Sequence, residues 1–75
     1  MSNIAPSDVH VVIATDGENT HYWAAVVPRQ EAAPAVQLLL GAGWTATLTD
    51  KHLTPDQVAA LDLSAGDVRE LKGAP

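Results

Sequence analysis

The residues from Val9 to Val27, VHVVIATDGENTHYWAAVV, decide the fold. Two runs rich in β-branched and aromatic residues, Val9–Thr15 and Thr20–Val27, predict two β-strands. Between them lies Asp16–Asn19, which contains Asp-Gly, the strongest short-range signal for a β-hairpin. The stretch therefore predicts an antiparallel hairpin, and Pro28 ends it because proline has no N–H to donate to a strand.

The hairpin has two alternative registers. A two-residue Asp-Gly turn places Thr15 opposite Glu18, whereas a four-residue loop places it opposite Thr20. Successive side chains of a strand point to opposite faces, so both registers produce the same two faces. The first face carries the cleaner apolar set: Val9, Val11, Ile13, Tyr22, Ala24 and Val26. The second face is mixed: His10, Val12, Ala14, His21, Trp23, Ala25 and Val27.

The middle of the chain predicts a helix and then a strand. The segment RQEAAPAVQLLL begins at Arg29 and has an apolar stripe at helical spacing, and Gly41 or Gly43 supplies the stop. The stripe consists of Ala32, Ala35, Val36, Leu39 and Leu40. The segment WTATLT, residues 44–49, alternates strictly and predicts a half-exposed strand with Trp44 on its inner side.

The C-terminal third has the best local helix signal in the chain. Thr54 is an N-cap, Pro55 occupies the first helical position, and Gln57 completes a capping box, so a short helix should end near Leu61 or Asp62. The following segment, SAGDVRELKG, predicts a short terminal helix with Ser64 as its cap, and a strand over Val68–Lys72 is the alternative.

These elements predict a single α+β domain over residues 1–75, with residues 1–7 as a flexible N-terminal arm. The expected order is ββαβα plus a short terminal helix or strand. It predicts a small three-stranded, mostly antiparallel sheet with helices on one face. The second face of the sheet is then partly open, and Trp23 lies on it.

The composition is that of one small acidic domain. The chain has no cysteine, which excludes disulfides and thiolate metal sites and favours a reducing, cytoplasmic setting. No basic leader with a long apolar run begins the chain, and no apolar run reaches the roughly 20 residues that span a bilayer. The net charge of −5 disfavours nucleic acid and anionic membranes as partners and favours a basic protein surface. The alternative interpretation is that this charge only keeps a small protein dissolved.

The negative charge lies in two parts of the chain. Residues 1–28 hold three acids and no lysine or arginine, residues 29–54 are balanced, and residues 55–75 hold four acids against two bases. If the hairpin turn and the C-terminal acids converge in space, they form one acidic patch; otherwise the charge is dispersed. The predicted partner-binding residues are acids from both parts together with one aromatic side chain: Asp16, Glu18, Trp23, Asp56, Asp62, Asp67 and Glu70.

The sequence shows no catalytic motif, and we expect neither an enzyme nor a cofactor. No serine lies in a Gly-x-Ser-x-Gly elbow, and no glycine-rich phosphate loop opens a helix. His10 and His21 share a predicted strand face, with His52 as a remote third ligand, but transition-metal sites usually use three or four protein ligands. A helix-turn-helix over residues 54–71 is disfavoured because its second helix carries acids as well as bases.

In size, acidity, lack of cysteine and absence of catalytic motifs, the whole chain resembles the small acidic inhibitors encoded by phages and mobile elements, anti-CRISPR proteins among them. Those proteins share no signature, so no residue role is carried over. The resemblance implies a non-enzymatic module that blocks a basic nucleic-acid-binding surface of a host complex. One alternative is a structural or accessory homo-oligomeric subunit that pairs through its open sheet face or strand edges. A second is a small metal- or ligand-binding domain that uses His10 and His21.

Overall fold

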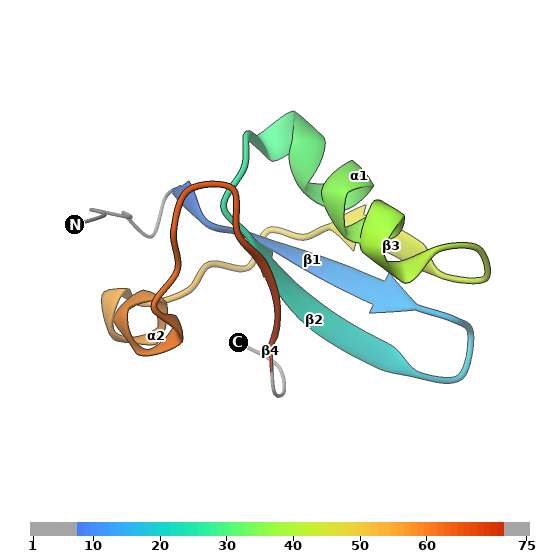
Figure 1. Cartoon of the computed structure of the whole chain (residues 1–75). Coiled ribbons are helices and arrows are strands. Elements are labelled where there is room, and N and C mark those ends of the chain that lie inside the picture. The colour runs from blue at the N-terminus through green and yellow to red at the C-terminus, as the bar shows by residue number, and fades with distance from the viewer. Residues whose placement is uncertain (1–7, 72–75) are drawn as a thin grey trace.

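The computed structural model describes residues 8–71, which form a four-stranded antiparallel sheet and two helices (Figure 1). The strands are β1 (His10–Thr15), β2 (Thr20–Ala25), β3 (Thr45–Leu48) and β4 (Val68–Leu71), and the helices are α1 (Arg29–Leu40) and α2 (Pro55–Leu61). The predicted α+β class is confirmed. The predicted three-stranded sheet is wrong, because β4 adds a fourth strand. The predicted arm, residues 1–7, lies outside the described residues.

The hairpin of β1 and β2 forms the centre of the sheet, whose strand order is β3-β1-β2-β4. Thr15 pairs with Thr20, so the register is that of the four-residue loop. β3 pairs with β1 and β4 pairs with β2, both antiparallel. The two hairpin strands therefore have neighbours on both sides, and the short outer strands are the edges of the sheet.

The C-terminal segment is a strand, so the predicted terminal helix is wrong and the alternative is confirmed over Val68–Leu71. Asp67 Oδ2 accepts a hydrogen bond from the Ser64 N–H (2.9 Å), which is one half of a capping box. The chain then turns at Gly66 (φ +87°), and the Val26 N–H donates to the Asp67 carbonyl at 2.8 Å. This hydrogen bond places Val68–Leu71 beside the free edge of β2. Pairing with β2 then satisfies the backbone N–H and C=O groups of the segment, as a helix would otherwise do. Lys72, the last residue of the predicted strand, lies outside the described residues.

The two helices cover opposite faces of the sheet, so the predicted arrangement with helices on one face is wrong. The segment around α2 packs on the face that carries Val9 and Val11, and α1 packs on the face that carries Val12 and Ala14. Both faces of the hairpin carry buried apolar side chains, and each face therefore needs an element that covers it. The α2 face stays open near the β1–β2 turn, where Thr20, Thr45 and Thr47 are exposed (Figure 1).

α1 buries a stripe that is rotated from the predicted one. Ala32 and Val36 are fully buried and Leu40 packs beside them, but Leu39, predicted to be inside, is 62% exposed. Leu38, Leu39 and Leu40 are consecutive, and 100° separates neighbours on a helix, so the three cannot all face the sheet. The sequence pattern does not say which leucine is buried.

α2 has the predicted structure. The Thr54 hydroxyl accepts from the Gln57 N–H (3.1 Å), and the Gln57 side chain accepts from the Thr54 N–H (2.8 Å), which completes the capping box. Leu53 and Val58 lie on either side of the N-cap at the positions of a hydrophobic staple, and both are buried in the cluster beneath the helix. These signals act between residues close in sequence, and the prediction succeeds for that reason.

Candidate functional site

The β1–β2 turn is a fixed structure built around the Asp16 carboxylate. Asp16 Oδ1 accepts hydrogen bonds from the Asn19 N–H (2.7 Å) and the Glu18 N–H (2.9 Å). Gly17 has φ +100°, a conformation that costs glycine little. The bonds from Asn19 and then Glu18 hold the pKa of Asp16 below its ordinary value, so this carboxylate is charged at neutral pH. The turn presents two exposed acids, of which Asp16 also holds the turn together.

Stability should depend on pH through Asp16. Its folded-state pKa lies below the unfolded value of about 3.9, so the carboxylate contributes stability above that pH and loses it as the pH falls through the folded pKa. Asp16→Asn keeps an oxygen for the turn but has no charge. Near neutral pH, we expect the wild type to have a higher urea midpoint than this variant. In strong acid, we expect the two midpoints to be equal. Glu18→Gln is the control, and a difference for Asp16→Asn that persists into acid contradicts the role of the charge.

A second acidic group lies at α2. Asp56 lies in the first turn of the helix, where the helix dipole favours an acid, and Asp62 is the C-cap residue with φ 51°. Both residues are exposed, and neither forms an ion pair within residues 8–71. Their charges are therefore available to a partner.

The acids around β4 already have partners. Arg69 donates from Nη1 to the Leu61 carbonyl (2.6 Å), and its Nη2 lies 3.8 Å from Asp67 Oδ2. Glu70 Oε2 lies 2.8 Å from His21 Nδ1. A partner that used Asp67 or Glu70 would compete with these contacts, which makes them weaker candidates than the acids of the turn and of α2.

The acids form two groups and not one patch. Figure 1 shows the β1–β2 turn and α2 at opposite ends of the molecule, which measures 36 × 21 × 18 Å along its principal axes. Glu70 lies between the groups: it pairs with Trp23, three residues or about 10 Å along β2 from Thr20. Of the two arrangements that the sequence left open, the dispersed one is therefore observed.

Trp23 packs beneath α1 and not on an open sheet face. It is half-buried against the cluster that contains Val12 and Val36, and Trp44 packs against the same cluster. Its buried Nε1 has no hydrogen-bond partner among the described residues. The predicted open position of Trp23 is wrong because α1 covers that face, and its role as a partner contact stays a prediction.

The two histidines proposed as metal ligands are far apart. His10 pairs with Ala25 and His21 with Ala14, so four residues of β1, or about 13 Å, separate them. His52 is exposed between β3 and α2. Residues 8–71 contain no group of three His, Cys, Asp or Glu side chains arranged to hold a metal ion. His10 and His21 share a face of the hairpin, as predicted, but the register places His21 of β2 beside Ala14, far along β1 from His10.

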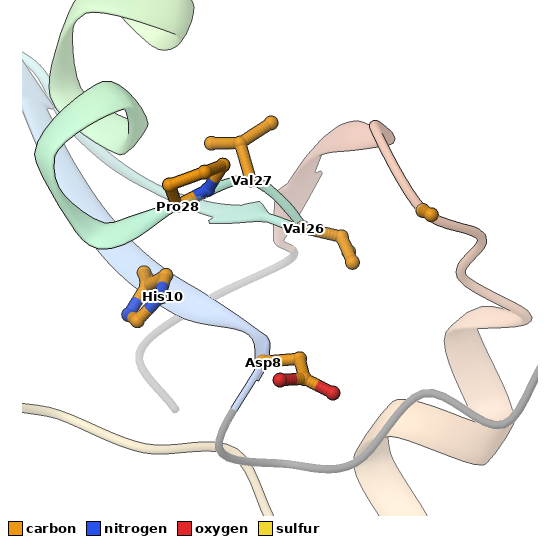
Figure 2. Close-up of a pocket in the computed structure, with 6 residues that line it drawn as sticks. Asp8, His10, Val26, Val27 and Pro28 are labelled. Carbon is orange, nitrogen blue, oxygen red and sulfur yellow. The ribbon is translucent and has the colours of Figure 1, made fainter.

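A cavity of about 330 Å³ lies beside the start of β1 (Figure 2). Its lining comes from three separate segments: Asp8, His10, Val26, Val27, Pro28 and Ala65. Sequence reasoning missed this cavity because only the fold joins those segments. Figure 2 shows one carboxylate and one imidazole beside apolar side chains. These groups alone do not define a reaction, because no nucleophile or oxyanion donor accompanies them in the lining.

These features define the chain as a small α+β domain that carries two separate groups of exposed acids. Within residues 8–71, no helix has the length and apolar character needed to cross a bilayer. Comparison with protein-family models, with curated proteins and with solved structures finds no match for this chain. What the protein binds has to be inferred from its own surface.

Proposed function

We propose that the protein is a non-enzymatic binding module that contacts a basic protein surface through its exposed acids. The four candidate contacts are Asp16 and Glu18 at the β1–β2 turn and Asp56 and Asp62 at α2. The proposed partner surface is one that binds nucleic acid, because carboxylates compete with phosphates for lysine and arginine. Blocking such a surface of a host complex is the action implied by the resemblance to small phage inhibitors.

The observation that carries the proposal is that no basic side chain among residues 8–71 forms an ion pair with any of these four acids. The basic side chains of residues 8–71 lie elsewhere: Arg29 is 3.9 Å from Asp50, Lys51 is 6.0 Å from the centroid of the Tyr22 ring, and Arg69 is 3.8 Å from Asp67. The excess negative charge therefore faces solvent, where it attracts a cationic surface and speeds encounter. Such binding weakens as salt is added.

Two double variants with the same net charge test the proposal and locate the contact. Asp16→Asn with Glu18→Gln removes two charges at the turn, and Asp56→Asn with Asp62→Asn removes two at α2. The proteins captured from a lysate by the wild type are identified, and the affinity of the most basic one is measured for each variant. At about 0.2–1 kcal/mol per exposed charge, the variant at the contacting end should bind roughly 2- to 30-fold more weakly.

The comparison between the two variants is the control for net charge. Equal losses in both variants indicate a general attraction that uses both ends, whereas a loss in one assigns the contact to that end. Binding that all four substitutions together and added salt leave unchanged would refute the proposal.

A further inference from the structure

One long segment of the chain contains no charged residue. No charged residue occurs between Glu31 and Asp50, and residues 32–49 form most of α1, the following loop and β3. Within this segment Leu38 is 86% exposed and Leu39 is 62% exposed. Pro34 is exposed and Ala35 half-buried one helical turn before them. These four residues form an uncharged strip, here called the α1 strip, on the outer side of the helix.

We propose that the α1 strip is a homodimer interface in which two copies of the chain pack α1 against α1 about a two-fold axis. An apolar strip of this kind marks an interaction site in a small protein. A basic partner gains nothing at an uncharged surface, whereas a second copy supplies the same apolar strip. In a two-fold interface each patch meets itself, so the strip needs no other complement. This proposal goes beyond the binding function and does not depend on it.

The distribution of charge permits this contact. Two molecules with a net charge of −5 repel each other in general, but no acid lies in the segment that contains the strip. α2 lies on the other face of the sheet, so the dimer leaves Asp56 and Asp62 exposed. The nearest acid is Glu31, which is exposed one helical turn before Pro34 and Ala35, at the end of the strip. At this rim position water and salt screen its repulsion.

The two edges of the sheet are poor routes to self-association. At the edge of β3, Gln37 Oε1 accepts a hydrogen bond from the outward Ala46 N–H (3.1 Å), and Gln37 also donates to the Gly41 carbonyl (2.9 Å). At the edge of β4, Arg69 and Glu70 are exposed, and charged side chains discourage strand pairing. The proposed helix-to-helix contact therefore differs from the alternative drawn from the sequence, in which copies pair through the open sheet face or the strand edges.

A standard dimer interface would cover a modest share of the surface of this chain. A standard interface needs about 800 Å² from each partner, which is about one sixth of the 4712 Å² accessible surface of this chain. Two large exposed leucines form the centre of the strip, and homodimer interfaces are more apolar than the remaining surface. Oligomerisation is also a usual source of stability for a domain of this size without disulfides.

Analytical ultracentrifugation of the full chain from low to several hundred micromolar tests the proposal. We expect the average mass to rise from one chain towards two, and the thermal midpoint to rise with protein concentration. The double variant Leu38→Glu with Leu39→Glu should weaken the dimer at least about tenfold while circular dichroism stays that of the wild type. Ala59→Glu with Ala60→Glu adds the same charge on exposed positions of α2 and should dimerise like the wild type.

Three results would overturn the dimer: a wild type that stays monomeric throughout, a glutamate variant of the strip that dimerises normally, or an α2 control that loses the dimer equally. A monomer whose capture of a basic partner is lost in the strip variant would assign the strip to that partner instead. Added salt separates the two proposals, because it should weaken binding to a basic partner but not an uncharged dimer contact.

Discussion

Replacing Leu53 with alanine is expected to unfold a large fraction of the protein at room temperature. Leu53 is 4% exposed and lies in the cluster with Val58 and Leu63 beneath α2. Truncating a buried leucine costs about 2–5 kcal/mol, because it removes apolar burial and leaves a cavity. A domain of this size without staples has only about 3–5 kcal/mol of net stability. The loss is therefore comparable with the whole free energy of unfolding, and urea denaturation followed by circular dichroism measures it.

Leu53→Met is the matched control, because it nearly conserves the volume and should cost less than about 1.5 kcal/mol. Both variants are compared at a low protein concentration, where self-association adds least to stability. A urea midpoint of Leu53→Ala equal to that of the wild type would show that α2 is not packed on the sheet.

The parts of the fold that sequence reasoning predicted depend on contacts between residues close in the chain. The hairpin follows from two strands and a short turn, and the start of α2 follows from Thr54, Pro55 and Gln57. In each case the decisive hydrogen bonds join residues a few positions apart. Such bonds are set by local residue type, and no knowledge of the remaining chain is needed.

The missed parts depend on contacts between distant residues. β4 forms because the Val26 N–H donates to the Asp67 carbonyl, and residues so far apart in the chain show no such relation in the sequence. The helices lie on opposite faces because the hairpin has apolar side chains to bury on both faces, and such a pattern does not tell which helix covers which face.

The candidate site was predictable only in its residue types. The acids of the turn and of α2 can be read from the sequence, but their separation depends on the strand order, which places the turn and α2 at opposite ends (Figure 1). The exposure of Leu39 was missed because leucine at helical spacing usually indicates a core. The available signal was three consecutive leucines in a long uncharged segment, which is more apolar surface than one helix face can bury.

Glutamate substitutions one turn apart on α1 should have opposite outcomes. Val36 is fully buried beneath the helix, and Val36→Glu places an unpaired carboxylate there, so we expect a loss of at least about 4 kcal/mol and an unfolded protein. Leu39 is 62% exposed, and Leu39→Glu should cost no more than about 1 kcal/mol, mostly because an acid near the C-terminal end of a helix opposes its dipole. Circular dichroism and urea denaturation of both variants at low protein concentration measure the difference.

This pair separates the observed stripe from the one that the sequence predicts. The predicted stripe contains both residues, so both substitutions should then be equally destructive. The observed stripe contains Val36 with Ala32 and Leu40, and it leaves Leu39 on the solvent side next to Leu38. If Leu39→Glu unfolds the isolated chain, then Leu39 belongs to the core, and α1 would lack the surface through which we expect two copies to meet.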